Sequence, residues 1–280
     1  MNKNWIKIAS VYIGTVIGAG FASGREILEF FGVYGIKGIF GIIVSGLLFS
    51  ILGSLFLLKI YKYRINGLNE LVGTIFGHRF SFVLDTIIGL SLYTGYSVML
   101  SGSGAIFKEE LGLSFNLGII VMVLFTFIVF LFKLEGLSII NTILVPILII
   151  GILFTSIYLN TREGFNISNI EGVRLTAKGN FISSSLLYFG SNSLIIIIVF
   201  SSLLPLVKDK KTAILGGAIG GFILFLLGLS ILLSMLIYYN EVANLEIPML
   251  KICGSINTVY RKVYAVILWI AIFTTAIANG

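Results

Sequence analysis

The residue types best suited to chemistry gather near the start of the chain, between Gly14 and Glu26. Four glycines fall within eleven residues of an otherwise apolar run, at positions 14, 18, 20 and 24. Glycine costs a helix about 1 kcal/mol relative to alanine and lets the backbone leave the helical region. A helix that breaks inside a membrane exposes N–H and C=O groups, which are tolerated there only when protein or a ligand satisfies them. We therefore interpret this stretch as half of a binding site.

Arg25 and Glu26 follow the glycines, where a simple membrane anchor would continue with leucine. A charge inside a bilayer costs at least about 2.5–3.5 kcal/mol, so it normally faces a cavity or a partner. We predict that this pair acts as a gate beside the site. The alternative is that both residues lie at the outer mouth of a short half-helix, or pair with each other or with Glu29.

A second polar cluster, Gly190-Ser191-Asn192 followed by Ser193, interrupts another apolar run. Taken alone, such a cluster is often a helix–helix contact, worth about 0.6 kcal/mol per hydrogen bond and up to about 2 kcal/mol. Two interrupted spans five helices apart are instead typical of inverted-repeat transporters, whose discontinuous helices meet at the membrane midplane. We therefore predict a break in this span as well, with Gly190, Ser191 and Asn192 facing the substrate.

Sequence patterns of soluble enzymes are absent, since the chain has no HExxH, CxxC, GxSxG or Walker motif. With one histidine and one cysteine, Cys253, it offers no metal-ligand spacing and no intrachain disulfide. The net charge of +7 lacks the basic patch with interleaved aromatic residues that is typical of nucleic-acid binding. We expect no enzymatic activity, no resident metal or cofactor and no nucleic-acid partner.

The composition places these residues in a lipid bilayer. Of the 280 residues, 58% are apolar and only 11% are charged, with a mean hydropathy of +1.08. A soluble globule of this size needs a largely polar surface. A bilayer core requires about 20 apolar residues per helix, and the runs here are too continuous for barrel strands. The sequence predicts an all-α membrane protein with eight spans, at residues 6–31, 36–59, 81–107, 116–133, 138–159, 180–206, 213–239 and 262–280.

The lysines and arginines predict the orientation. Dense clusters at Lys59 to Arg64 and at Lys208-Asp209-Lys210-Lys211 adjoin span ends, whereas the cations of the opposite loops are spread out. Cytoplasmic loops carry such clusters, so we expect the N-terminus in the cytoplasm of a cell-membrane protein. On the other side, the segment from Asn240 to Arg261 contains an apolar patch at 247–254 that is too short to span. This patch forms either a re-entrant, lid-like hairpin or an ordinary amphipathic surface segment.

The eighth predicted span ends abruptly, because Thr274 to Gly280 is still apolar and no polar tail follows. We expect the chain to be a fragment of a longer protein; the alternative is that its eighth helix ends at the carboxylate. We treat the chain as one transmembrane domain, with residues 1–159 as a first five-helix repeat and 180–280 as a partial second repeat.

The motif from Gly14 to Glu26, together with Phe273-Thr274-Thr275-Ala276-Ile277-Ala278-Asn279-Gly280, resembles the bacterial YkvI-type membrane protein family. The likeness runs over essentially the whole chain. That family in turn resembles the amino acid–polyamine–organocation transporters and their sodium-coupled relatives with the LeuT fold, through spans one, six and eight. The resemblance implies a LeuT-like inverted-repeat bundle with discontinuous first and sixth helices.

The resemblance also implies roles for individual residues. Backbone amides of Ala19 and Gly20 would bind a substrate carboxylate, at the positive end of a half-helix. A sodium ion would lie between the carbonyls of Gly14 and Ile17 and the hydroxyls of Thr274 and Thr275, because oxygen ligands suit a hard cation. The alternative for the threonines is a hydrogen bond to their own helix. Sodium coupling, proton coupling and the absence of a coupling ion all remain open.

Two further expectations concern the third span and the gate. Tyr93 and Tyr96 lie in the middle of that span, away from the interfacial belts where tyrosine is common, and we expect one of them to line the substrate site. In related transporters an arginine near position 25 pairs with an acid on a tenth helix. The sequence contains eight predicted spans, so Arg25 lacks that partner if the chain is complete.

The sequence thus predicts a secondary active transporter of an amino acid or a similar small zwitterionic solute, which works by alternating access. Its partners would be the lipid bilayer and the solute, with Na+ or H+ as the possible coupling ion. The alternative function is a nutrient receptor or signalling subunit that keeps the transporter fold and binds without transport.

Overall fold

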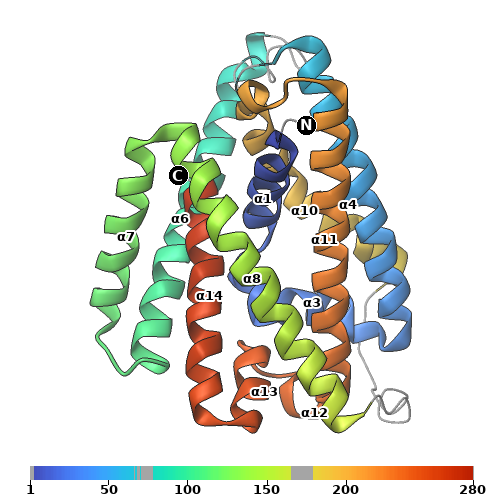
Figure 1. Cartoon of the computed structure of the whole chain (residues 1–280), viewed down its shortest axis with the longest axis vertical. Coiled ribbons are helices and arrows are strands. Elements are labelled where there is room, and N and C mark those ends of the chain that lie inside the picture. Colours follow the sequence, from blue (N-terminus) through green and yellow to red (C-terminus); the bar gives the residue numbers. More distant parts are fainter. Residues whose placement is uncertain (1–2, 66, 68–69, 71–77, 165–178, 280) are drawn as a thin grey trace.

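The computed structural model describes residues 3–65, 67, 70, 78–164 and 179–279, and within them the chain is helical and contains no strand. The helices occur in the order α1 (Asn4–Val16), α2 (Ala19–Ser23), α3 (Arg25–Phe30), the 3-10 turn η1 (Gly32–Tyr34), α4 (Ile36–Tyr63), α6 (His78–Glu109), α7 (Phe115–Leu131), α8 (Lys133–Glu163), α10 (Phe181–Ser202), the 3-10 turn η2 (Leu204–Leu206), α11 (Lys210–Ile237), α12 (Tyr239–Val242), α13 (Pro248–Ile256) and α14 (Thr258–Asn279) (Figure 1).

The all-α membrane architecture is confirmed. Among the described residues, five helices are long and apolar enough to cross a membrane: α4, α8 up to Arg162, α10, α11 and α14. The helix α7 is apolar but shorter, at 17 residues, and the predicted first span is divided among α1, α2 and α3. The count of eight spans is therefore not reproduced by length and hydropathy.

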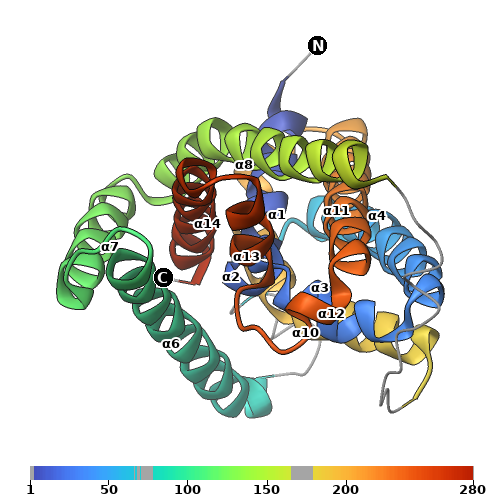
Figure 2. The same ribbon diagram turned by 90° about the horizontal axis from the view of Figure 1, so that it is seen from below.

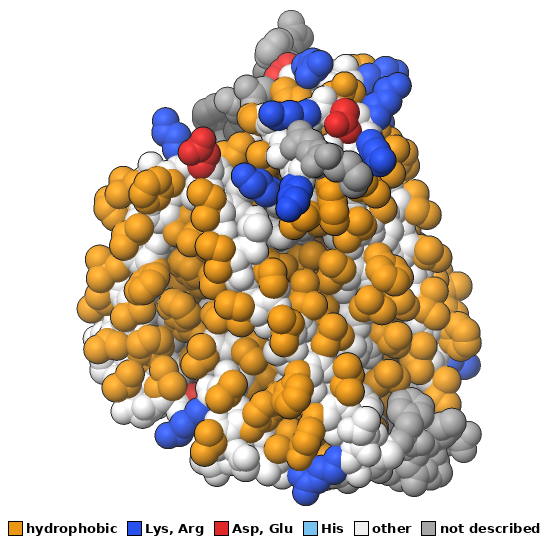
Figure 3. All heavy atoms as spheres, viewed as in Figure 1, with side chains coloured by type: hydrophobic (Ala, Val, Ile, Leu, Met, Phe, Trp, Pro, Cys, Tyr) orange, Lys and Arg blue, Asp and Glu red, His pale blue; other side chains and the backbone are white. Residues whose placement is uncertain are grey.

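The outer surface of the molecule is largely apolar. Many large apolar side chains are exposed, such as Leu47 of α4 and Ile150 of α8, which are 56% and 68% exposed. An apolar surface covers the middle of the molecule (Figure 3).

The helix α1 lies at the centre of the bundle. Its residues from Ile8 to Val16 are all buried, and α8, α10, α11 and α14 pack around it. Seen along the bundle, α6 and α7 form an outer pair on one side, with α7 farthest from α1 (Figure 2). The helix α8 crosses the bundle obliquely and contacts α1, α11 and α14 (Figure 1). The central helix is thus shielded from lipid, and its backbone can be irregular only because other helices cover it.

The pair α4 and α11 forms the closest helix contact. Small residues line it on both sides: Gly217 of α11 lies against the backbone of Ser54, and Gly221 against that of Ser50. Ser54 Oγ also donates a hydrogen bond to the carbonyl of Ile214 at 3.1 Å. Small residues let two backbones approach closely, which is the main source of helix association in a membrane. The closely packed pair lies beside α1, which contacts α11.

The helix α11 starts at a capped N-terminus. Asp209 accepts a hydrogen bond from the backbone N–H of Thr212 at 2.6 Å, and this bond holds the pKa of the Asp209 carboxyl below its usual range. The cap satisfies one of the N–H groups left free at a helix start.

The predicted break in the first span is confirmed. The helix α1 ends at Val16, and Ile17 and Gly18 connect it to the five-residue helix α2. A second interruption follows at Gly24, whose φ of 83° lies in the left-handed region that favours glycine. A side chain at Gly24 would also overlap Met235 of α11. The glycine-rich stretch therefore forms two short half-helices rather than one span.

The predicted break in the sixth span is wrong, because α10 runs without interruption from Phe181 to Ser202. The polar side chains bond to their own helix: Ser191 Oγ and Asn192 Nδ2 both donate to the carbonyl of Tyr188, at 2.9 and 3.0 Å. Such bonds satisfy the polar groups of serine and asparagine without opening the backbone ladder. The LeuT-like feature of a discontinuous sixth helix is thus absent here.

The apolar patch at 247–254 belongs to α13, a nine-residue helix that is too short to span. Its buried face includes Met249, Leu250 and Cys253, and it packs on α14 and α2. The helices α12 and α13 lie at the end of the bundle opposite to the start of α1 (Figure 1). The patch is therefore an amphipathic surface helix that covers the end of α2. Between α8 and α10, residues 165–178 lie outside the described part of the chain.

Candidate functional site

The break in the first span meets the C-terminal half of α14. Thr275 Oγ1 lies 3.0 Å from the carbonyl oxygen of Ile17 and 3.3 Å from that of Gly14, and its position allows it to donate to either. Thr274 behaves differently, because its hydroxyl bonds to the carbonyl of Ala271 in its own helix at 2.9 Å. Of the four predicted cation ligands, the structure brings Gly14, Ile17 and Thr275 together. Thr274 adopts the alternative arrangement.

The break is what makes the two carbonyls available. In a continuous helix Gly14 O would accept from the N–H of Gly18, but that N–H turns to Val16 O at 2.9 Å. The N–H of Ala22 bonds to Gly18 O, so Gly18 is the N-cap of the new helix, which starts at Ala19. Both freed carbonyls then point at a side chain that lies 258 or more residues away along the chain. A site made from such distant segments exists only in the folded bundle.

A second long-range bond holds the same region. Tyr264 of α14 is fully buried, and its hydroxyl donates to the carbonyl of Ala22 in α2 at 2.8 Å. Tyr264 and Thr275 are 11 residues apart, which is close to three helical turns, so they share one face of α14. That face therefore fixes both α1 and α2. The spacing was visible in the sequence, but a tyrosine and a threonine at this distance do not by themselves indicate a site.

Glu26 lies against Gly20, so close that a methyl group at Gly20 would overlap its carboxylate. Glu26 is half-buried, and no hydrogen bond or ion pair to it is found among the described residues. Ala19 and Gly20 are the first residues of α2, so their N–H groups have no partner within the helix. The part of the site predicted to bind the substrate thus combines the free N–H donors of Ala19 and Gly20 with the unpaired carboxyl group of Glu26.

Arg25 has three hydrogen-bond partners. Its Nε bonds to Glu29 Oε1 at 2.6 Å, and its Nη1 donates to the carbonyls of Ala243 and Leu245 at 3.1 and 3.0 Å. The pair with Glu29 is the arrangement expected from the sequence as the alternative to a gate. Its other partners are backbone oxygens between α12 and α13, so Arg25 fastens the half-helix α3 to the segment that covers this end of the bundle.

Tyr93 and Tyr96 do not join the break. Tyr93 is 71% exposed, and Tyr96 shares a hydrogen bond of 2.7 Å with Thr126 of α7. The physical reason is the position of α6, which pairs with α7 at the outside of the bundle, away from α1 (Figure 2). Gly190 and Ser191 of α10 are also exposed, and Asn192 is half-buried. These five predicted substrate contacts lie outside the cluster around Gly14, Gly20 and Thr275.

Tyr188 is a site candidate that the sequence did not indicate. It is 3% exposed, its hydroxyl has no hydrogen-bond partner, and its ring packs on Phe30, Phe31 and Phe49 at centroid distances of 5.2, 5.1 and 5.8 Å. Phe30 is one turn after Glu26 in α3, so the two share a face of that helix. This aromatic group therefore borders the region that contains the free acid.

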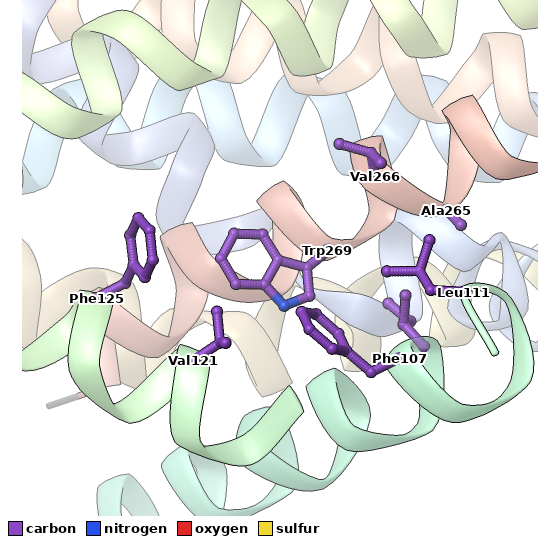
Figure 4. Close-up of a pocket in the computed structure, with 8 residues that line it drawn as sticks. Phe107, Leu111, Val121, Phe125, Ala265, Val266 and Trp269 are labelled. Atoms are coloured by element: carbon purple, nitrogen blue, oxygen red, sulfur yellow. The ribbon is translucent and has the colours of Figure 1, made fainter. Parts of the chain in front are cut away.

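A cavity of about 260 Å³ lies between α6, α7 and α14 (Figure 4). Phe107, Val121, Phe125 and Trp269 line it, and the only polar atom of Trp269 already donates to Ser103 Oγ at 2.7 Å. No predicted site residue reaches this cavity. Its walls are apolar, so it suits a hydrocarbon chain rather than a polar solute.

Metal-binding side chains do not gather in the described part of the chain, where no group of three or more His, Cys, Asp or Glu residues is close enough to share an ion. The candidate site therefore consists of neutral oxygens at the break in the first span, with one acid a short distance beyond it. This combination offers ligands to a hard monovalent cation and a counter-charge to an ammonium group.

Comparison with solved structures supports the fold. A mutant of the manganese transporter of Eremococcus coleocola matches with a TM-score of 0.64 at 16% sequence identity, over 98% of this chain and 64% of the transporter chain. The chain thus spans less than two thirds of that transporter. At this identity the likeness shows a shared membrane-transporter fold and nothing about the solute.

Comparison with protein sequences identifies closer relatives. No family model matches the chain. It is 24% identical over 268 residues to the uncharacterized protein YyaD of Bacillus subtilis (strain 168), covering 95% of this chain and 76% of the relative. It is 31% identical over 274 residues to the uncharacterized membrane protein YkvI of the same organism, covering 98% of this chain and 78% of that protein. The chain therefore belongs to the family of multi-pass membrane proteins represented by YkvI.

Proposed function

We propose that this protein is a secondary active transporter that moves an amino acid or a similar small zwitterion by alternating access, with sodium as the coupling ion. The observation that carries the proposal is the contact of Thr275 Oγ1 with the freed carbonyls of Gly14 and Ile17. Transporters with broken helices bind their ions and solutes at such breaks, between parts of the bundle that move relative to one another.

The ligand types favour sodium over a proton. A threonine hydroxyl and two backbone carbonyls do not change protonation state in the physiological range, so they cannot carry a proton across the membrane. They do resemble the oxygen ligands that hard cations prefer. Ion binding would connect α14 to the central helix α1, and the loss of the ion would loosen this connection.

The neighbouring residues favour a zwitterionic solute. The Glu26 carboxylate would attract an ammonium group, while the free N–H groups of Ala19 and Gly20 would donate hydrogen bonds to a carboxylate of the same solute. An uncompensated acid within an apolar bundle is costly unless a partner neutralises it. A solute that carries both charges satisfies both edges of the site at once.

We further propose that the N-terminus is cytoplasmic and that the protein resides in the cell membrane. Cationic side chains gather at the end of the bundle where α1 begins (Figure 3), an end that includes Lys7, Lys208, Lys210 and Lys211. Cytoplasmic surfaces carry an excess of such residues. In this arrangement the helices up to residue 159 form a first repeat, and residues 180–280 begin a second.

Uptake into proteoliposomes tests the proposal. The full chain is reconstituted, and the accumulation of a radiolabelled amino-acid mixture is measured under an inward sodium gradient and under an equal potassium gradient. We expect accumulation above equilibrium with sodium only, and no sodium dependence in Thr275→Val. Saturable binding without accumulation would support the receptor function instead. Uptake that does not depend on sodium, and that is lost when the pH gradient is dissipated, would show that Thr275 does not bind the coupling ion.

A further inference from the structure

Asn141 is one of the buried polar residues of α8 that the proposed function leaves unexplained. It is fully buried, and its Nδ2 donates to the carbonyl of Leu137 in its own helix at 2.9 Å. The Leu137 carbonyl can only accept, so the amide nitrogen must face it and the amide oxygen must face away. That oxygen, Oδ1, has no hydrogen-bond partner.

The unpartnered oxygen is directed at the broken helix. Asn141 Oδ1 lies against Gly14 of α1, where any side chain on Gly14 would overlap it. Gly14 also provides one of the two carbonyls that Thr275 contacts. Three helices therefore place oxygens around the end of α1: Gly14 O and Ile17 O from α1, Thr275 Oγ1 from α14 and Asn141 Oδ1 from α8.

Too few hydrogen-bond donors are available to satisfy these four oxygens. The Thr275 hydroxyl carries a single proton, which can satisfy one of the two carbonyls fully but not both. Asn141 Oδ1 receives none. Buried acceptors without donors are unfavourable, and native structures rarely keep them without a ligand, an ion or water. The arrangement therefore calls for a positively charged or hydrogen-bonding occupant.

We propose that Asn141 Oδ1 is a ligand for the coupling cation, completing a site whose other ligands are Gly14 O, Ile17 O and Thr275 Oγ1. The inference rests on the proposed sodium coupling and adds α8 to the ion site. All four ligands are neutral oxygens, which suits a monovalent ion, whereas protein sites for divalent cations usually supply carboxylates. The ion would then connect α8 and α14 through the break in α1.

A second polar residue of α8, Ser138, lies near Asn141 and is also unpartnered. Ser138 is three residues before Asn141 and therefore lies one turn away on the same face. Its hydroxyl is also buried without a partner. Ser138 lines a cavity of about 450 Å³, together with Asn4, Lys7 and Glu135, at the end of the bundle where α1 begins. Ser138 is thus an unpartnered polar group of α8 between this cavity and Asn141.

Thermal unfolding of the purified full chain in detergent tests the proposal without requiring transport. The midpoint is measured in increasing NaCl, with KCl keeping the ionic strength constant. We expect a saturable rise with sodium in the wild type. Asn141→Leu replaces the amide by an apolar group of similar size. We expect that this variant will need a sodium concentration at least tenfold higher to reach half of the maximal rise in the unfolding midpoint.

The unfolding midpoint in KCl alone distinguishes a cation ligand from a residue with a purely structural role. If Asn141 is a ligand, Asn141→Leu removes an unsatisfied acceptor, and its midpoint in KCl equals or exceeds that of the wild type. A structural role would instead lower the midpoint in both salts. Thr142→Val is the matched control, because the Thr142 hydroxyl bonds to Ser138 O at 2.6 Å within α8. This control should keep the wild-type sodium response.

Asn141→Asp keeps the proposal testable if the leucine variant does not fold. A buried carboxylate without a cation is unfavourable, so we expect a lower midpoint in KCl and a larger rise with NaCl than in the wild type. The absence of any sodium response in this variant, or a half-saturation in Asn141→Leu within twofold of the wild type, would overturn the inference.

The outcomes also separate this inference from the proposed function. If Thr275→Val loses the sodium response while Asn141→Leu keeps it, only the role of Asn141 is wrong. If the wild type itself responds equally to sodium and potassium, sodium coupling and the role of Asn141 fail together. If the sodium response is present but proteoliposomes accumulate no solute, the ion site stands and the transport function does not.

Discussion

Arg25 and Glu26 are adjacent in sequence and yet have different environments. The guanidinium of Arg25 has three partners and connects α3 to the segment between α12 and α13. The carboxylate of Glu26 has none among the described residues and lies at Gly20, beside the break. A charge that is already paired can only hold parts of the protein together, whereas an unpaired one can bind something that arrives. We therefore separate the predicted gate pair into a fastening residue, Arg25, and a solute-binding residue, Glu26.

Glu26→Gln tests this assignment at the residue scale. A hydrogen bond between charged groups contributes about 1.5–3 kcal/mol, so removing the negative charge should lower kcat/KM for amino-acid uptake by about tenfold to more than a hundredfold. The side chain keeps its size, and the sodium-dependent midpoint should not change. Glu29→Gln is the control, since Glu29 is on the same helix but pairs with Arg25. Equal uptake by Glu26→Gln and the wild type would exclude Glu26 as the ammonium partner.

Helix breaks were only partly predictable, for physical reasons that differ between the two spans. In the first span, closely spaced glycines lower helix stability, and Thr275 and Tyr264 supply hydrogen bonds to the opened backbone. In α10 there is one glycine, and the adjacent serine and asparagine bond to their own helix instead. A polar cluster alone therefore does not predict a break. The prediction succeeded where glycines were dense and failed where they were not.

The residues of the site were predictable to a similar extent. Gly14, Ile17 and Thr275 follow from the resemblance to transporters of known fold, and the structure brings them together. The inward direction of Asn141 and the outward direction of Tyr93 depend on how α8 and α6 are rotated about their axes. In a membrane both faces of a helix can be apolar, so hydropathy does not reveal this rotation.

A pair of glycine substitutions tests the helix packing at the element scale. Gly190 of α10 has open space where a Cβ would be, whereas a Cβ on Gly217 of α11 would meet the backbone of Ser54. We expect Gly190→Ala to be neutral or to stabilise by up to about 1 kcal/mol, because alanine favours a continuous helix. Gly217→Ala should destabilise by about 1–3 kcal/mol through overpacking. The measurement is the thermal midpoint in detergent, and equal losses in both variants would contradict a continuous α10.

The whole molecule has two chemically different ends. The start of α1 lies next to η2, where Asn4 Nδ2 donates to the carbonyl of Leu206 at 3.0 Å, so the chain start and the cluster at Lys208 to Lys211 share one end. The helix α11 then runs for 28 residues, or about 42 Å, to the opposite end, where α12 and α13 cover the half-helices. An apolar surface separates the ends (Figure 3). The fold therefore fixes which segments share a side of the membrane, and the cationic cluster predicts which side is cytoplasmic.

Labelling of single cysteines tests this orientation. Lys210→Cys and Glu246→Cys place exposed thiols at the two ends, while the native Cys253 is buried and provides an unlabelled background in the wild type. With a membrane-impermeant maleimide, we expect Glu246→Cys to react in intact cells and Lys210→Cys to react only after the membrane is permeabilised. The reverse pattern would place the N-terminus outside. It would also place the cavity lined by Ser138 on the outer side of the membrane.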